Sequence, residues 1–253
     1  MDIVVIGSGK VATLFSRCME QAGHNIAQVY SRDSDHAIAL ATKLKNTEAT
    51  DRIDKVLTAA DAYLVAVKDD AIADVAKWLL VQGKVVAHCS GTLPADVLEQ
   101  SSQDCGVIWP LFSINNEPIE GLDKLPLMVN AKTSYAEKIL MELALCISKN
   151  VHILTAQQKT ALHLCAVMSN NFCNHLLALT GKLAALHQLN FQLLLPLIHQ
   201  TLNNAANAAE SQTGPAIRHD EGTMDTHLNL LKATPLWQQV YTTLTQSIQD
   251  FYR

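Results

Sequence analysis

Residues 2–12 read DIVVIGSGKVA, a β-branched run followed at once by two glycines and the start of a helical stretch. A short β-branched run is typical of a buried parallel strand. Gly7 permits a tight turn, Gly9 lets a ligand approach the backbone, and Ala12 is small enough for close packing of helix on strand. The N–H groups and positive dipole end of that helix suit phosphate groups. The pattern predicts a site for a dinucleotide diphosphate, with a purely structural glycine turn as the alternative. The residues assigned to it are Gly7, Ser8, Gly9, Lys10 and Val11.

A second strand is predicted at residues 26–30, and its end should lie near the adenosine ribose. Sites for NAD usually place an Asp or Glu there, whereas this chain has Ser31 and Arg32. A hydroxyl and a guanidinium suit a 2′-phosphate, because Arg forms bidentate charge-assisted bonds to it. NADP(H) is therefore favoured over NAD(H). Two alternatives remain: Asp33 could serve as a displaced ribose ligand, and Arg32 could be an ordinary surface charge.

Strands and helices continue to alternate through the first half of the chain. Strands are predicted at residues 62–67, 84–89, 106–109, 126–130 and 151–154, and helices at 71–80, 93–100 and 135–148. Ser134 and Glu137 are expected to form a capping box at the start of the last helix. Such alternation implies parallel pairing and a doubly wound parallel sheet.

Ligands of doubly wound sheets bind beyond the carboxyl ends of the strands. This rule adds Val67 and Lys68 to the cofactor site, although Lys68 and Asp69 could instead cap the next helix. It also nominates His88 and Ser90, which could hydrogen-bond a substrate or the nicotinamide. The alternative for that pair is a polar turn around the glycine that follows.

From Thr155 onward the pattern is helical. Thr155 and Gln158 are expected to form a capping box, which begins a long apolar-periodic helix running to about residue 187. Further helices are predicted at residues 191–211 with a bend near Pro196, at 224–232, and at 235–251 with Pro235 in the tolerated first position. The predicted architecture is an α/β Rossmann domain, residues 1–154, followed by an all-α helical domain, residues 155–253.

Polar residues form a stripe on the first long helix. Lys159, His163 and Asn170 fall within about 40° of one another at 100° per residue. They could donate protons and hold a carboxylate or carbonyl group, or they could form a partly exposed polar face. Arg218 and Asp220 lie in a second polar concentration, which could line a substrate cleft or form an ion pair within a loop.

The composition limits the class of protein. The 253 residues carry a formal net charge of −5 with no long run of one sign, which argues against nucleic acid as the main partner. Six cysteines without a CxxC pair indicate the reduced thiols of a cytoplasmic protein, not metal ligands or a disulfide framework. Residues 176–198 are too polar to cross a membrane, and no signal peptide is visible. The Leu- and Ala-rich helical half has more apolar surface than one sheet domain can cover, which predicts a homodimer.

Several of these motifs match one known family. They comprise residues 7–12, 88–91, 110–113 and 214–220, with Lys159, His163, Ser169, Asn170 and His227. On them the chain resembles bacterial Rossmann-like proteins whose N-terminal half is labelled an NADP oxidoreductase and whose helical C-terminal domain has no assigned function. It is also similar to the superfamily of pyrroline-5-carboxylate reductase, ketopantoate reductase and the 3-hydroxyacid dehydrogenases. The resemblance implies a helical domain that commonly builds a homodimer, and a cleft between the domains where a substrate meets the nicotinamide.

The chain departs from these relatives at two places. Many family members have His before the Pro-Leu pair, where this chain has Trp109. The Lys-x-x-x-Asn pair of the hydroxyacid dehydrogenases is not reproduced either, because His163 stands four residues after Lys159. The chemistry of the relatives therefore does not transfer intact.

The expected function is that of an NADP(H)-dependent oxidoreductase acting on a small carbonyl or imine substrate. The roles expected are proton donor for Lys159 or His163, substrate anchor for Asn170, proximity to the nicotinamide for His88 and Ser90, and carboxylate binding for Arg218. A histidine exchanges protons near neutral pH, which favours it as the donor. The alternative is an NADP(H)-binding sensor or regulatory protein without redox turnover, and the third possibility is a structural dimer whose nucleotide cleft stays empty.

Overall fold

The computed structural model describes residues 1–114 and 121–253. The chain divides into two compact units, Met1–Met168 and Ser169–Arg253. The first unit extends past Thr155, the predicted start of the helical domain, because Lys159 and Leu162 pack against the sheet half of the molecule. The domain boundary at Thr155 itself stays a prediction.

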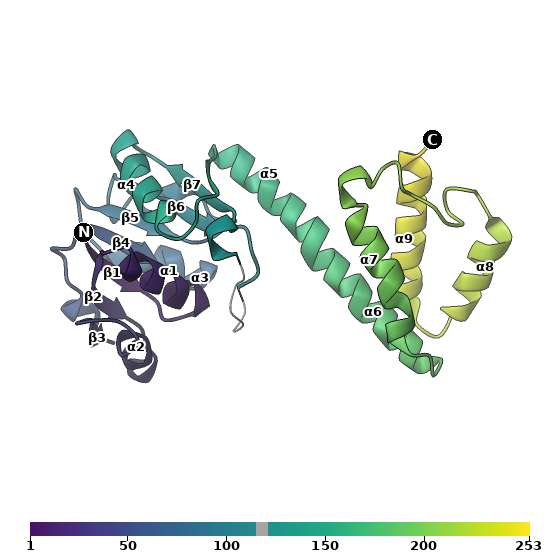
Figure 1. Cartoon of the computed structure of the whole chain (residues 1–253), viewed down its shortest axis with the longest axis horizontal. Helices are drawn as coiled ribbons and strands as arrows, with labels where there is room; N and C mark the ends of the chain where they lie inside the picture. Colours follow the sequence, from purple (N-terminus) through teal and green to yellow (C-terminus); the bar gives the residue numbers. More distant parts are fainter. Residues whose placement is uncertain (115–120) are drawn as a thin grey trace. The chain divides into compact units, whose positions relative to one another are not determined.

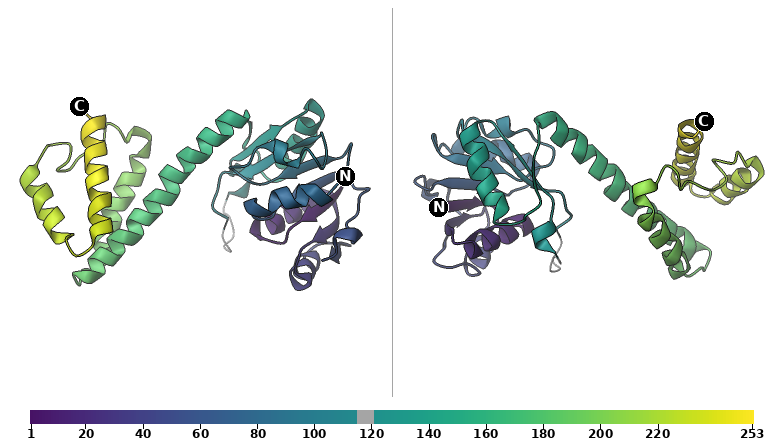
Figure 2. Two further views of the ribbon diagram at one scale, coloured as in Figure 1. Left: turned by 180° about the vertical axis from the view of Figure 1, so that it is seen from behind. Right: turned by 45° about the horizontal axis from the view of Figure 1, so that its top comes forward.

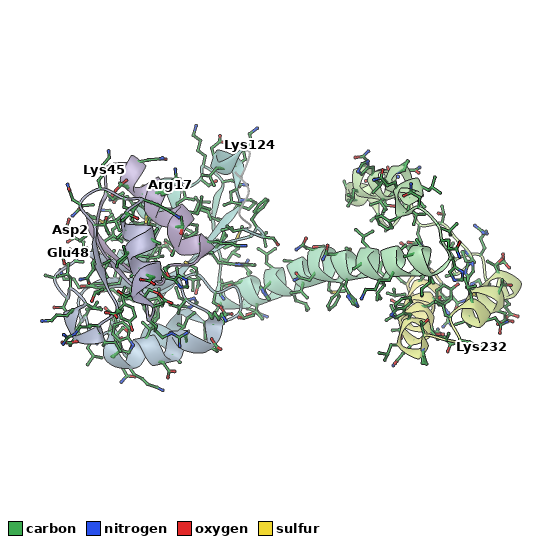
Figure 3. All side chains as sticks on the ribbon, turned by 90° about the horizontal axis from the view of Figure 1, so that it is seen from below. Asp2, Arg17, Lys45, Glu48, Lys124 and Lys232 are labelled. Atoms are coloured by element: carbon green, nitrogen blue, oxygen red, sulfur yellow. The ribbon has the colours of Figure 1, made fainter. Side chains whose placement is uncertain are left out.

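The first unit is built on one mixed sheet whose strands lie in the order β3-β2-β1-β4-β5-β6-β7-β8 (Figure 1). The strands are β1 (Asp2–Ile6), β2 (Asn25–Tyr30), β3 (Glu48–Thr50), β4 (Ala62–Val65), β5 (Val85–His88), β6 (Cys105–Pro110), β7 (Leu127–Ala131) and β8 (Val151–Ile153). From β3 to β6 all neighbours run parallel, so their carboxyl ends share one edge. Asp2 and Glu48, the first residues of β1 and β3, lie on the same side of the unit in Figure 3. The predicted α/β Rossmann class is confirmed.

One pair of strands contradicts the prediction of uniform parallel pairing. β7 runs antiparallel to β6, with Gly106 opposite Ala131 and Pro110 opposite Leu127. A parallel return needs a crossover, usually a helix. In the described part of the β6–β7 connection the regular structure is the short 3₁₀ turn η3 (Leu122–Lys124). β8 then pairs parallel with β7, so the sheet is mixed at this end only.

Helices cover both faces of the sheet. The first unit contains the helices α1 (Lys10–Gln21), α2 (Ser34–Ala41), α3 (Asp69–Trp78), α4 (Ser134–Leu145) and α5 (Ala156–Ala166), with the 3₁₀ turns η1 (Ile53–Lys55) and η2 (Ala95–Leu98). Of these helices, α1 to α4 contribute to the two cores that flank the sheet. Ile3 and Val5 of β1 belong to a core that includes α1 and α4, whereas Val4 and Ile6 belong to a second core that includes α3. Burial on both faces explains the continuous β-branched run of this strand.

Three local predictions for the first unit need correction. The N-cap of α4 is Thr133 and not Ser134, since the Thr133 hydroxyl accepts a hydrogen bond from Ala136 N at 3.1 Å. The helix predicted at residues 93–100 is reduced to the 3₁₀ turn η2, in which Val97 N donates to Pro94 O and Glu99 N to Asp96 O. Leu93 precedes a proline, which disfavours a helical conformation at residue 93. The helix α2 and the three-residue strand β3 were not predicted at all.

The second unit is helical in both views of Figure 2. From α5 onward the elements are the π-helical turn η4 (Val167–Phe172), α6 (Cys173–Leu186), η5 (Phe191–Leu194), α7 (Leu195–Asn203), η6 (Ala205–Asn207), α8 (Glu221–Leu230) and α9 (Pro235–Phe251). The capping box of Thr155 and Gln158 is confirmed, as is Pro235 at the start of α9. The helix predicted at 191–211 is wrong in extent, because Pro196 lies in the first turn of α7 and does not bend a longer helix.

Few apolar side chains of the second unit are buried. They are Ala184, Ala216 and Leu231. Seven of its leucines are largely exposed, with exposed fractions between 55% and 75%: Leu186, Leu189, Leu193, Leu197, Leu202, Leu230 and Leu236. No helix in the described residues has the length and apolarity needed to span a membrane.

Candidate functional site

The site begins where three neighbouring strands end. Ile6 of β1 lies opposite Val65 of β4, which lies opposite His88 of β5. A cleft of about 590 Å³ follows this edge of the sheet. The nine residues predicted to hold a cofactor all line it: Gly7, Ser8, Gly9, Lys10, Val11, Ser31, Arg32, Val67 and Lys68. The fold therefore brings this whole predicted set together, because the carboxyl ends of the parallel strands converge on one edge.

The two glycines of the first turn are required for different reasons. Gly7 has φ +117°, and a Cβ at this position would overlap the carbonyl oxygen of Ala66. Its N–H donates to Tyr30 O at 2.7 Å, which ties the turn to β2. Gly9 has an ordinary φ of −73°, and a Cβ there would meet no atom within 4 Å. The protein's own packing thus demands Gly7, whereas at Gly9 the space in front of the backbone is left open for a group from outside.

The N-terminus of α1 completes this cradle for an anion. Gly9 is the N-cap of α1 and has no side chain to accept from the first N–H groups, and the first turn of the helix contains no acidic residue. Lys10, the first helical residue, adds a positive charge beside the cleft. Helix N-termini of this kind favour negative charge. The residues present therefore fit the diphosphate of a dinucleotide.

The end of β2 forms one end of the cleft. The Ser31 hydroxyl accepts a hydrogen bond from the Ser8 hydroxyl at 3.0 Å. Asp33 is the N-cap of α2, accepting from His36 N at 3.1 Å, and its other oxygen lies 3.7 Å from His36 Nδ1. These contacts occupy Asp33 and weaken its alternative role as a ribose ligand. Arg32 and His36 both line the cleft. Sequence reasoning missed His36, because the helix that carries it was not predicted.

Next to the other end of the cleft lies a hydrogen-bonded turn, residues Ser90–Leu93, which follows the lining residue Cys89. The Ser90 hydroxyl donates to Asp69 Oδ2 at 2.7 Å, and the Thr92 hydroxyl donates to the same oxygen at 2.6 Å. The Ser90 oxygen in turn accepts from the N–H groups of Thr92 and Leu93, each at 3.1 Å. Asp69 and Cys89 line the cleft, so this network links the turn to its wall.

His88 lies wholly buried behind the turn Ser90–Leu93. Its Nε2 donates to Pro94 O at 3.1 Å, and its Nδ1 accepts from Ser90 N at 3.1 Å. Burial is the main cause that lowers the pKa of His88 to about 4, with the positive charge of Lys159 acting in the same direction. The imidazole is therefore neutral at pH 7 with both nitrogens engaged by the backbone. Its predicted place near the nicotinamide stays a prediction.

Lys159 is also buried, with 1% of its surface exposed. Its ammonium donates to the carbonyl oxygens of Leu93 at 2.7 Å and Gly91 at 2.8 Å, and more weakly to that of Ser90 at 3.4 Å. Burial lowers the pKa of this ammonium, and the charge of Asp69 acts in the opposite direction. Lys159 thus contacts the turn Ser90–Leu93 from the side of α5.

His163 follows one helical turn later in a different environment. Its ring packs on that of Trp109, with centroids 5.6 Å apart and planes inclined by 52°. Within the described residues its nitrogens make no hydrogen bond, and the side chain is half-buried. Gly91 completes this contact, because a Cβ there would come within 2.6 Å of His163 and 2.7 Å of Trp109. Trp109, noted as a departure from relatives, therefore serves as a platform for His163.

The last two predicted site residues belong to the second unit. Asn170 lies in η4, whose π geometry invalidates the 100° spacing that put it on one stripe with Lys159 and His163. Arg218 is exposed and forms no ion pair among the described residues, so the predicted pairing with Asp220 is absent there. Asp220 caps α8 through Thr223 N at 3.1 Å. The substrate roles of Asn170 and Arg218 stay predictions.

Two family models match the chain. Residues 2–90 match the family described as NADP oxidoreductase coenzyme F420-dependent, and residues 125–248 match the domain of unknown function DUF2520. No curated protein matches the sequence. Among the described residues, no three side chains of His, Cys, Asp or Glu gather into a group that could hold a metal ion.

Solved structures are similar over nearly the whole chain. A candidate NADP oxidoreductase of Bacteroides fragilis is 32% identical, with 98% of each chain covered and a TM-score of 0.86. A protein of Thermotoga maritima is 22% identical over 99% of this chain and 98% of its own, with a TM-score of 0.74. An imine reductase of Myxococcus stipitatus in complex with NADP⁺ shares the fold at 12% identity, covering 99% and 93%, with a TM-score of 0.70.

The first of these structures is similar enough in sequence, over nearly the whole of both chains, to establish kinship. The DUF2520 match begins within the sheet, before β7, and continues through the helical second unit. The chain therefore belongs to the family of NADP oxidoreductase-like proteins in which a Rossmann half precedes a DUF2520 half.

Proposed function

We propose that the protein is an NADP(H)-dependent oxidoreductase that acts on a small carbonyl or imine substrate. The observation that carries the proposal is the open space in front of Gly9, at the uncapped N-terminus of α1, inside a cleft of about 590 Å³. The fold shared with an imine reductase and with a reductive aminase in complex with NADPH supports the choice of substrate class.

The cleft suggests how the dinucleotide would be held. Residues 7–11 would bind the diphosphate through backbone N–H groups. Ser31, Arg32 and His36 would surround the 2′-phosphate, since they line the end of the cleft next to β2. The nicotinamide half would then extend toward Asp69, which follows β4, and Cys89, which follows β5. When bound, NADPH supplies a hydride, and the protein supplies orientation and a proton.

Of the two candidate proton donors, His163 is the better placed. Lys159 has three N–H groups, and all of them point to backbone carbonyls. His163 is half-buried, held by its ring contact with Trp109, and its nitrogens are open to a substrate. An imidazole exchanges protons near neutral pH, as the proposed chemistry requires.

Binding of the dinucleotide is tested by replacing Gly9 with Ala. The new methyl meets no protein atom, so the fold should be kept, but it would enter the space proposed for the diphosphate. We expect NADPH to bind about a hundredfold more weakly, roughly 2.7 kcal/mol. The free energy of unfolding should fall by no more than about 1 kcal/mol, because Ala is a poorer N-cap than Gly. Gly222→Ala in α8 is the matched control, because a Cβ there makes only an ordinary contact at 3.9 Å. Unaltered NADPH binding by Gly9→Ala would refute the proposed site.

Turnover separates the enzyme from its alternative. An oxidoreductase should oxidise NADPH with at least one member of a panel of keto acids and cyclic imines. A protein that binds NADPH tightly and oxidises none of it across that panel would be a sensor. The hydrogen bonds of His88 and Lys159 to backbone carbonyls are also compatible with that function, because neither side chain then has a proton available for a substrate.

We also propose that the protein is a homodimer. Leu193 and Leu236 are 73% and 75% exposed, and the second unit buries very little apolar surface of its own. Large exposed apolar surfaces mark interaction sites, and two-fold dimers are the commonest way to cover them. Sedimentation equilibrium at micromolar concentration should give twice the chain mass, and a monomer there would contradict the proposal.

A further inference from the structure

We infer that Lys159 is a positioning residue that holds the turn Ser90–Leu93 and, through this turn, the cleft-wall residues Asp69 and Cys89, which face the nicotinamide half of the dinucleotide. The placement of the nicotinamide rests on the proposed function, whereas the contact of Lys159 with the turn is independent of it. This role differs from the proton donation expected from the sequence.

The donor capacity of Lys159 is already used. An ammonium has three N–H groups, and the carbonyls of Ser90, Gly91 and Leu93 provide three acceptors at 3.4, 2.8 and 2.7 Å. The side chain is 1% exposed, so water does not compete for these bonds. A substrate could receive a proton from Lys159 only after one of these backbone bonds had broken. This geometry fits a residue that holds the backbone of the turn in place, and does not fit a proton donor to a substrate.

The charge of Lys159 is satisfied by dipoles instead of by an ion pair. Among the ion pairs of the described residues Lys159 has none, although Asp69 is near enough to affect its pKa. A buried charge is tolerated only when hydrogen bonds replace its water. Removing the ammonium would in turn leave two buried carbonyls and one partly buried carbonyl without their partner, which costs free energy unless the turn moves. The cation and the shape of the turn therefore depend on each other.

The turn is held from two further directions. On one side the hydroxyls of Ser90 and Thr92 donate to Asp69, the first residue of α3 and part of the cleft wall. On the other side His88 donates to Pro94 O immediately after the turn. Lys159 is the connection that comes from α5. Loss of it should loosen the turn and with it the position of Asp69 and Cys89.

The two ends of the cleft should respond differently to that loss. The end formed by Ser31, Arg32 and His36 has no contact with the turn Ser90–Leu93 or with Lys159 among the hydrogen bonds of the described residues. A ligand that fills only this end should therefore be insensitive to Lys159. A ligand that reaches Cys89 and Asp69 should depend on it.

The experiment compares NADPH with 2′,5′-ADP, which contains the adenosine half and its 2′-phosphate. Both dissociation constants are measured by calorimetric titration for the wild type, Lys159→Met and Lys77→Met. Methionine keeps the length of the buried chain without its donors. Lys77 of α3 is exposed and paired with Asp74, and serves as the matched control for loss of one positive charge.

We expect Lys159→Met to weaken NADPH binding about tenfold or more while 2′,5′-ADP stays within about twofold. Lys77→Met should change neither. Equal NADPH affinity in Lys159→Met and wild type would overturn the inference, as would equal weakening of both ligands. A proton donor would give a third pattern that also overturns it: turnover lost while NADPH binding is intact.

Hydrogen exchange of the free protein provides a readout independent of any ligand. The N–H groups of Thr92 and Leu93 donate to the Ser90 hydroxyl, so they should exchange about tenfold faster in Lys159→Met if the turn loosens. Unchanged exchange there would overturn the inference. Protection elsewhere in the sheet shows that the variant is folded. If the wild type bound neither ligand, the proposed function would fail, and exchange would still decide the role of Lys159.

Discussion

Protonation of His88 should make the protein less stable as the pH falls below neutrality. The imidazole is wholly buried, with Pro94 O and Ser90 N on its two nitrogens. Folding lowers its pKa from the ordinary 6.5 to about 4, chiefly by burial. Between these two values the unfolded chain binds more protons than the folded one. The stabilisation is therefore fully present above pH 6.5 and is lost as the pH falls through about 4.

The size of the effect follows from the same two pKa values. A difference of about 2.5 pKa units corresponds to a stabilisation of at most roughly 3.5 kcal/mol, at about 1.4 kcal/mol per unit. Between pH 7 and pH 5 the linkage relation gives a loss of about 2 kcal/mol from this one side chain. That is a large fraction of the stability of an ordinary domain.

The assay is urea unfolding followed by tryptophan fluorescence at pH 7, 6 and 5, for the wild type and for His88→Gln. Glutamine can still donate to Pro94 O but does not titrate, so the carboxylates and other histidines contribute equally to both proteins. The difference in unfolding free energy between the two should shrink by about 2 kcal/mol from pH 7 to pH 5. Parallel loss of stability in the two proteins would refute the reasoning.

Three other changes probe the cleft and its surroundings. Arg32→Ala should weaken NADPH binding about tenfold to hundredfold, the range for a hydrogen bond to a charged group, and leave NADH binding unchanged; equal effects on both would contradict a role at the 2′-phosphate. Gly91→Ala should cost about 1–3 kcal/mol in urea unfolding, because its methyl overlaps His163 and Trp109; an unchanged midpoint would contradict that packing. His163→Ala should lower kcat about a hundredfold or more with NADPH affinity intact, as expected for a proton donor; an unchanged kcat would remove His163 from the chemistry.

The strand–turn–helix at the start of the chain could be predicted because its requirements are local. Gly7, Gly9 and Ala12 are required by the turn between strand and helix, by the approach of a ligand to the backbone and by the packing of the helix on the strand, all of which involve residues close in sequence. The rest of the cofactor set followed from one general rule, that parallel strands end at a common edge. Ser31 and Lys68, nearly forty residues apart in the chain, could be assigned to one site for this reason.

The features that escaped prediction depend on partners distant in sequence or on small local differences. Lys159 donates to backbone carbonyls, and because every residue has a backbone carbonyl, the sequence gives no sign of which ones accept these bonds. The π turn at η4 changes the angular position of every following residue around the helix axis, and no residue type in the sequence predicts such a turn. His36 was missed with α2, an element of eight residues without a strong apolar period.

The nearly coreless second unit has a practical consequence for handling the protein. With only Ala184, Ala216 and Leu231 buried, residues 169–253 cannot offset the chain entropy lost when they fold alone. A truncated chain carrying just this portion should be degraded rapidly in cells. If a second copy completes its interior, the melting temperature of the intact protein should climb with concentration, since dilution would draw the pair apart.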